Sequence, residues 1–167
     1  MSTMIAAEAM RRNGAGRVIC VEPYPKEFLA DLGVELLQRP VQELAPEWFR
    51  EQLPEGSILF IDSTHAVKVG SDCLHLYLRV LPALRSRVFV HVHDFFLPRG
   101  TPSEWIHHRL FWTEQYLVFA YLLGNPHARV IFGSVANIVW HRDLMHELMH
   151  GRAPAGGGSL WFEQSLA

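Results

Sequence analysis

Acidic and histidine side chains follow two apolar runs of this sequence, and they are the residues best suited to chemistry. Asp62 ends the run "SILFID" and is soon followed by His65, whereas His93 and Asp94 end the run "RVFVHVHD". Imidazole nitrogens and carboxylate oxygens together suit zinc, manganese or iron(II). The sequence therefore predicts a mixed nitrogen and oxygen metal site from these four residues, with Asp62, His93 and Asp94 as its principal ligands.

His91 and His93 also have a structural interpretation. They are two residues apart on an expected strand, so their side chains point to one face together with that of Phe89. Asp94 points to the other face unless the strand ends before it. The two histidines could instead pack in the sheet and hydrogen bond to the backbone, and the sequence leaves both interpretations open.

The elements that must position these residues alternate between helix and strand along the chain. The inner strands are continuously apolar, which predicts an α/β fold with a mostly parallel sheet and helices on both faces. Ligands of such sheets bind beyond the carboxyl ends of the strands. Those ends carry Glu22, residues 40–42, Asp62 and Asp94. This convergence is the strongest functional signal that position alone provides.

Three of the expected helices have boundaries that the sequence marks. Ser71 is placed to cap a helix over residues 70–84. One long, aromatic-rich helix is expected over residues 101–125, capped by Ser103. A further helix is expected over residues 136–151.

The last of these helices contains "MHELMHG", with the H-E-x-x-H pattern of many zinc hydrolases. On a helix, His146 and His150 would share a face beside Glu147 and could hold zinc. The segment lies away from the acidic strand ends, however, and no clear third ligand follows. Gly151 ends the expected helix, where histidines are favourable without a metal. A zinc hydrolase is therefore a remote alternative.

Composition limits the classes of function. The 167 residues suit one domain, and 49% of them are apolar, which is enough for a core. A net charge of −2 disfavours nucleic acid as a partner. The two cysteines are far apart and form no CxxC pair, which indicates neither a disulfide framework nor a cysteine zinc site. We expect a cytoplasmic protein without a signal peptide or a membrane-spanning segment.

Four segments together resemble the class I S-adenosylmethionine-dependent methyltransferases: "RVICVEPYP", "ILFIDSTH", "VFVHVHDFFLP" and "WTEQYLVFAYL". More narrowly, they resemble the bacterial O-methyltransferase-like branch, which is similar to catechol and macrocin O-methyltransferases. The resemblance covers nearly the full length, and the combination of motifs is specific. It implies a Rossmann-like sheet whose last strand, "SLWFEQ", runs antiparallel beside "ARVIFGS". It also implies methyl transfer to a hydroxyl of a small-molecule acceptor.

The resemblance assigns cofactor-binding roles to individual residues. Glu22 matches the acid that accepts hydrogen bonds from both ribose hydroxyls of S-adenosylmethionine, and Tyr24 would lie near the adenine or ribose. Val41 and Gln42 match the loop at the adenine edge. Asp62 follows the strand whose end faces the methionine part of the cofactor and the acceptor.

The same resemblance implies the catalytic and metal residues. His65 lies near the position of the general base in catechol-type enzymes, so Asp62 and His65 are the predicted catalytic pair. Asp94 and Pro98 match the acid and the proline beside a magnesium ion in those enzymes. Phe95 stands where an amide ligand is expected, so a divalent metal here would need the histidines instead.

The start of the sequence departs from the family pattern. The first strand and the glycine-rich loop, G-x-G-x-S/T, would come just before "STMIAAEAM". Ser2 and Thr3 match the tail of that loop and are assigned to the cofactor site. We therefore expect one N-terminally truncated methyltransferase-like domain over residues 1–167, in which a gap in the sheet favours a homodimer. The alternative is a non-catalytic remnant of the fold or a partner-binding domain.

Overall fold

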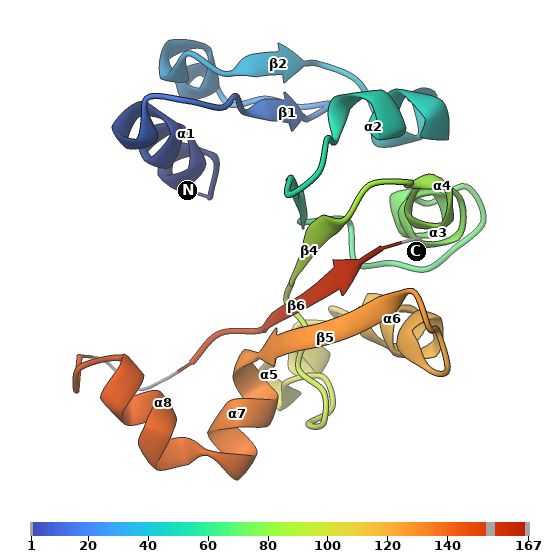
Figure 1. The fold of residues 1–167 in the computed structure, drawn as a ribbon. Coiled ribbons are helices and arrows are strands. Elements are labelled where there is room, and N and C mark those ends of the chain that lie inside the picture. The colour runs from blue at the N-terminus through green and yellow to red at the C-terminus, as the bar shows by residue number, and fades with distance from the viewer. Residues whose placement is uncertain (1, 153–155, 166–167) are drawn as a thin grey trace. The chain divides into compact units, whose positions relative to one another are not determined.

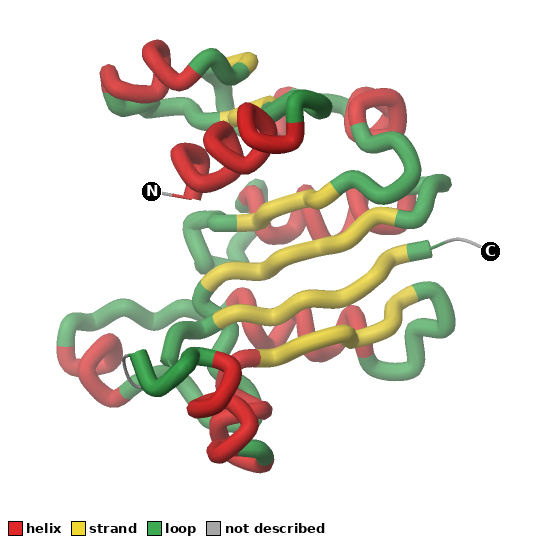
Figure 2. Tube along the Cα trace, turned by 60° about the vertical axis from the view of Figure 1, so that its left-hand side comes forward, coloured by secondary structure: helices red, strands yellow, loops and turns green. Residues whose placement is uncertain are grey.

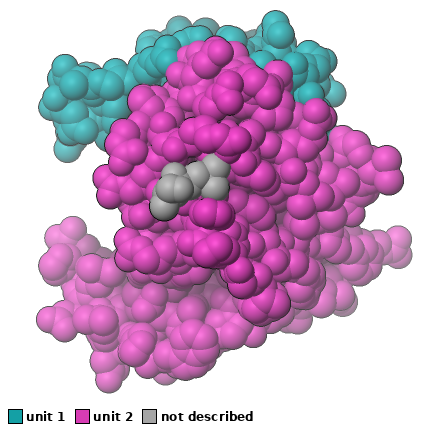
Figure 3. All heavy atoms as spheres, turned by 45° about the vertical axis from the view of Figure 1, so that its right-hand side comes forward, with its two compact units in different colours: residues 1–44 teal, residues 45–167 magenta. Residues whose placement is uncertain are grey.

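The computed structural model describes residues 2–152 and 156–165 of the chain. Internal contacts divide the chain into two compact units, residues 1–44 and residues 45–167 (Figure 3). The single domain expected from the sequence stays a prediction. In the described part of the chain, every helix is too short or too polar to cross a membrane.

The first unit combines one regular helix with a two-stranded parallel sheet. Its elements are α1 (Ser2–Asn13), β1 (Ile19–Val21), a 3₁₀ helix (Glu27–Leu32), β2 (Glu35–Leu37) and a second 3₁₀ helix (Val41–Glu43). In the sheet, Ile19 lies opposite Glu35 and Val21 opposite Leu37. α1 ends at Asn13, because the following Gly14 adopts a φ of 64° that favours glycine.

The second unit contains a four-stranded sheet in the order β3-β4-β6-β5 (Figure 1). Its strands are β3 (Ile58–Ile61), β4 (Val88–His93), β5 (Ala128–Gly133) and β6 (Ser159–Gln164). Its helices are α2 (Pro46–Gln52), α3 (Asp72–His75), a π-helical segment (Leu76–Val80), α4 (Leu81–Ala83), α5 (Ser103–His107), α6 (Glu114–Leu122), α7 (Ser134–Trp140) and α8 (Arg142–Leu148).

One face of this sheet carries the core. Val88, Val90 and Val92 alternate along β4 on this face and are buried, as is Phe162 of β6. The π-helical part of the segment 72–83 contacts α6. Figure 2 shows helices behind the four strands of the sheet. The alternate residues of β4 are half-buried on the other face. Helices on that second face stay a prediction.

The strand pairings differ from the mostly parallel sheet that was expected. Within the described strands of this sheet, β3 and β4 are parallel, whereas β6 is antiparallel to both β4 and β5. β4 and β5 run in the same direction, but they do not pair with each other. β6 lies between them and pairs with both. The antiparallel last strand beside β5 is therefore confirmed, and the prediction of a mostly parallel sheet is wrong.

The prediction of one long helix over residues 101–125 is wrong, because this segment forms two helices, α5 and α6. Arg109 has a φ of 59° in the intervening loop. The backbone oxygen of His65 accepts hydrogen bonds from the N–H groups of Thr113 and Glu114, at 2.8 and 3.1 Å. A distant loop therefore sets the start of α6. Ser103 is the first residue of α5, and Pro102 takes the N-cap position in its place.

The other two helix predictions have different outcomes. Ser71 caps α3 as predicted, because its Oγ accepts a hydrogen bond from the N–H of Leu74 at 3.3 Å. The helix expected over residues 136–151 is interrupted at His141, which separates α7 from α8.

Candidate functional site

Two parallel strand ends bring the predicted residues together at one edge of the four-stranded sheet. Ile61 ends β3 opposite Val92, so Asp62 and His93 follow side by side. β4 ends at His93, and Asp94 adopts a φ of 57°. Because of this left-handed conformation, the side chain of Asp94 does not follow the alternation of side chains between the two faces of the strand. Its carboxylate faces His93 instead. The sequence had not decided to which face Asp94 points.

Asp62, His65, His93 and Asp94 form a compact group, hereafter the His–Asp cluster. Nε2 of His65 lies 3.6 Å from Oδ1 of Asp62 and 3.7 Å from Oδ2 of Asp94. Nδ1 of His93 lies 3.5 Å from Oδ1 of Asp62 and 3.2 Å from Oδ2 of Asp94. His65 is buried, whereas Asp62 and His93 remain about half exposed. The cluster therefore has an enclosed side and a side open to a ligand.

A buried carboxylate holds His65 in place. Oε2 of Glu114 lies 2.7 Å from Nδ1 of His65, and the hydroxyl of Tyr77 donates to Oε1 of Glu114 at 2.7 Å. Glu114 and Tyr77 are both buried. Neither had been assigned a role from the sequence. The signal was the acid in the apolar run "WTEQYLVFAYL", because a carboxylate is costly to bury without a partner.

Charge and burial shift the pKa values of the cluster. Burial alone would lower the pKa of His65, but hydrogen bonds to Asp62 and Glu114 and the negative charge of Asp94 raise it to about 9. The hydrogen bond with His65 lowers the pKa of Asp62, whereas burial raises the pKa of Asp94. By itself, the cluster therefore holds a proton on His65 at neutral pH. His65 can act as a general base only after that proton is lost or displaced.

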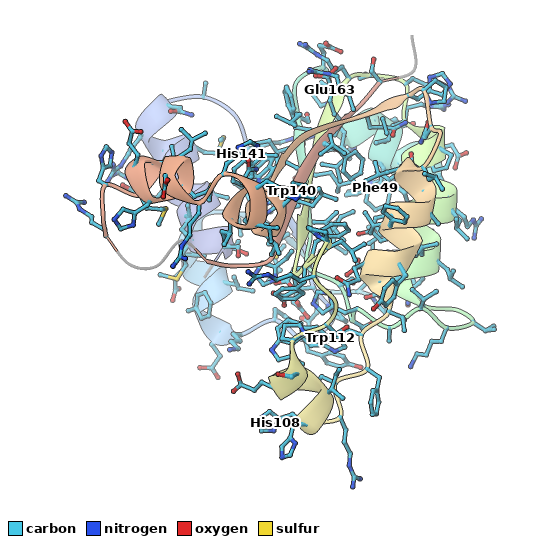
Figure 4. All side chains as sticks on the ribbon, turned by 90° about the horizontal axis from the view of Figure 1, so that it is seen from below. Phe49, His108, Trp112, Trp140, His141 and Glu163 are labelled. Carbon is cyan, nitrogen blue, oxygen red and sulfur yellow. The ribbon has the colours of Figure 1, made fainter. Side chains whose placement is uncertain are left out.

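A small cavity adjoins the cluster. Its volume is about 10 Å³, close to the space of one water molecule, and its walls include His65, Asp94, Glu114, Trp105 and Trp112. The ring centres of Trp112 and His65 are 4.2 Å apart. Figure 4 shows Trp112 near α5, well separated from Trp140 at the end of α7. The cavity thus brings aromatic surface to the enclosed side of the cluster.

His91 packs in the sheet, as the structural interpretation of the two strand histidines expected, but its hydrogen bond is to a side chain. Its Nε2 lies 2.6 Å from Oγ of Ser159, and its ring stacks on Trp161 with centres 4.2 Å apart. Burial lowers its pKa to about 4, so the ring is neutral at physiological pH. His91 therefore joins β4 to β6, and His93 alone of this pair belongs to the cluster.

The first unit brings several predicted cofactor residues to one edge of its sheet. β1 and β2 are parallel, and the N–H of Glu22 continues their pairing by donating to the oxygen of Leu37 at 3.1 Å. Oε1 of Glu22 accepts a hydrogen bond from the N–H of Tyr24 at 2.9 Å. Val41 and Gln42 begin the 3₁₀ helix after β2. The carboxyl ends of both strands thus carry residues assigned to the cofactor.

Ser2 and Thr3 are the first residues of α1. The side chain of Thr3 hydrogen bonds to the thiol of Cys20, so the start of α1 lies against the strand that leads to Glu22. A separate open hollow in this unit is lined by residues such as Met4, Arg17 and Glu35. That hollow contains none of the predicted cofactor residues, and it is therefore a competing location for a ligand.

The H-E-x-x-H segment does not assemble a metal site. Within residues 2–152 and 156–165, Asp62, His65 and His93 are the one group of at least three ligand residues whose donor atoms all lie within 4.8 Å of one another. α8 ends at Leu148, and His150 has a φ of 52° outside the helix. The helical spacing that zinc binding requires is therefore absent from this segment.

Acids at the carboxyl ends of parallel strands, as found here, are typical of α/β proteins that bind ligands at such ends. The chain belongs to the methyltransferase-domain family, whose model matches residues 1–95. That range includes the first unit, β3, β4 and the whole His–Asp cluster. Comparisons with curated proteins and with solved structures found no match.

Proposed function

We propose that the chain is a methyltransferase that uses S-adenosylmethionine and methylates a hydroxyl of a small-molecule acceptor. The convergence of the His–Asp cluster at the ends of β3 and β4, inside the family match, carries this proposal. The bound cofactor would supply the methyl group. The protein residues bind the two substrates, orient them and take up the hydroxyl proton.

Glu22 is the proposed ribose-binding residue. The carboxylate keeps lone pairs for a cis-diol after it accepts the hydrogen bond from Tyr24, because two oxygens offer about four acceptor positions. The Tyr24 side chain is 87% exposed and is therefore available to contact the adenine or ribose. Val41 and Gln42 would meet the adenine edge, and Ser2 and Thr3 would lie at the start of α1 nearby.

The acceptor would bind at the His–Asp cluster of the second unit. Asp62 and Asp94 can accept a hydrogen bond from the hydroxyl and hold its oxygen for an in-line reaction. The proton then passes to the cluster. Because its raised pKa keeps His65 protonated at neutral pH, His65 would act as the base only after losing that proton. A cytoplasmic location and a homodimer stay predictions.

Calorimetric titration of the whole chain with S-adenosylmethionine tests this proposal. We expect micromolar binding that Glu22→Ala weakens at least about tenfold, the loss of roughly 1.4 kcal/mol. Glu27→Ala is the matched control, because Glu27 is an exposed acid of the same unit. No binding by the native chain would overturn the proposal and favour the non-catalytic alternative. Equal weakening by both variants would refute the role of Glu22.

A further inference from the structure

We propose that Asp62, His65 and His93 bind one divalent transition-metal ion of the zinc type. The ion would lie at the open side of the His–Asp cluster, with Asp94 next to its remaining coordination position. The inference deepens the proposed function, because the metal would share the site at which the acceptor hydroxyl binds. With Nε2 of His65 bound to the metal, the hydroxyl proton would pass to Asp94 instead of to His65.

The donor atoms determine the class of metal. Two imidazole nitrogens and one carboxylate oxygen suit zinc, iron(II) or manganese, whereas magnesium prefers a sphere of oxygen ligands. Three protein ligands with an open position are typical of a catalytic zinc site rather than a closed structural one. A metal in such a position can lower the pKa of a bound hydroxyl. The chemistry of the ligands therefore matches the proposed reaction at an oxygen.

The spacing of the donor atoms fits such an ion. Bonds of about 2.0–2.2 Å in a tetrahedral site place neighbouring ligand atoms about 3.3–3.6 Å apart. Oδ1 of Asp62 is 3.6 Å from Nε2 of His65 and 3.5 Å from Nδ1 of His93. One ligand atom from each of the three residues lies within 4.8 Å of a ligand atom from each of the others. The ligands therefore need little movement to close around an ion.

One ligand atom lacks a hydrogen bond although it is buried. Nδ1 of His93 is the one buried side-chain nitrogen or oxygen without a hydrogen-bond partner in the part of the chain that the structure describes. It lies 3.2 Å from Oδ2 of Asp94, which is close enough for an ion pair but outside the geometry of a hydrogen bond. Buried polar atoms rarely stay unsatisfied, and coordination to a metal ion would satisfy this nitrogen.

Glu114 prepares His65 as a ligand. A carboxylate at 2.7 Å from Nδ1 favours the tautomer that carries a proton there, which leaves the lone pair of Nε2 directed at the cluster. Tyr77 satisfies the other oxygen of Glu114 and is itself buried. Metal-binding histidines usually have such a carboxylate partner. Glu114 is thus a positioning residue for the metal.

The competing hypothesis is that a proton, rather than a metal, neutralises the carboxylates. A doubly protonated His65 can pair with Asp62, Asp94 and Glu114 and leave the cluster without an ion. Metal binding would displace the proton from Nε2, because a ligating imidazole must be neutral. The two hypotheses differ in one measurable quantity, which is the zinc bound by each chain.

The test is a zinc titration of the whole chain after chelator treatment, with the bound metal counted by mass spectrometry. We expect one zinc per chain at neutral pH, weakened at least about tenfold by His93→Ala and by about 10–100-fold by Glu114→Gln. His107→Ala is the matched control, because His107 is exposed and outside the cluster. Circular dichroism of each variant checks the fold. The visible spectrum of the native chain with cobalt(II) reports four-coordinate binding without any mutation.

Three results would overturn the inference. They are no zinc bound by the native chain, equal weakening by His93→Ala and His107→Ala, or zinc lost on His146→Ala alone. The titration contains neither S-adenosylmethionine nor an acceptor, so it is independent of the proposed function. Zinc binding without cofactor binding would leave the metal site standing and reject the methyltransferase. Cofactor binding without zinc binding would reject the metal site and leave the methyltransferase proposal standing.

Discussion

Asp94 owes its place in the His–Asp cluster to a single backbone angle. Its φ of 57° ends β4 and turns the carboxylate toward His93. Aspartate adopts this conformation more readily than most residues. His65 has the same φ, which histidine also adopts more readily than most residues, and its contacts with Glu114 and Trp112 hold it there. Backbone strain of about 1–3 kcal/mol is typical of functional sites.

The site residues divide into those that the sequence predicts and those that it does not. Asp62, His65 and Asp94 could be predicted because the end of an apolar run is visible in the sequence. Glu114 is separated from His65 by 49 residues, and from Tyr77 by 37. No local pattern reveals a contact at that distance. The sequence therefore predicted the residues of the His–Asp cluster but not the buried residues that support them.

Tyr77→Phe should destabilise the protein by about 1–3 kcal/mol, because Oε1 of buried Glu114 would lose its hydrogen-bond donor. Urea unfolding followed by circular dichroism measures this change. Tyr116→Phe is the control, since the Tyr116 side chain is 52% exposed. Equal stability of the Tyr77→Phe and Tyr116→Phe proteins would show that the Tyr77 hydroxyl does not support Glu114.

Among the elements, β6 has the largest effect on the architecture. Its backbone pairs with one edge of β4 and with one edge of β5. Its side chains Leu160 and Phe162 complete the buried face of the sheet. The sequence predicted the presence of most helices and strands, because apolar periodicity is local. It predicted the pairings less well, since the position of β6 depends on contacts with distant strands. The break between α5 and α6 has the same kind of cause.

The segment leading into β6 also limits the space around the cluster. A Cβ at Gly158 would lie 2.9 Å from two ring carbons of Phe96 and 3.0 Å from Cα of Asp94. Gly158→Ala should therefore destabilise the protein by about 1–3 kcal/mol through overpacking. Gly100→Ala is the control, because a Cβ there meets no atom within 4 Å. Thermal unfolding of both variants checks the prediction, and a fully stable Gly158→Ala protein would contradict it.

At the scale of the whole molecule, the two units differ in the size of their cores. Leu29 and Leu44 are the buried apolar side chains among the described residues of the first unit. The second unit buries many more, with Tyr77, Phe162 and the valines of β4 at its centre. The strand ends of the first unit therefore have little packing of their own, and a ligand bound there should order them measurably.

Hydrogen exchange of the whole chain, followed by mass spectrometry with and without S-adenosylmethionine, tests the proposed function most directly. Binding at the strand ends predicts slower exchange in residues 19–24 and 35–43, which include Glu22 and Gln42. Exchange in residues 142–150 should not change. Unchanged exchange at the strand ends, or protection confined to residues 4–18 or 142–150, would contradict the proposed cofactor site.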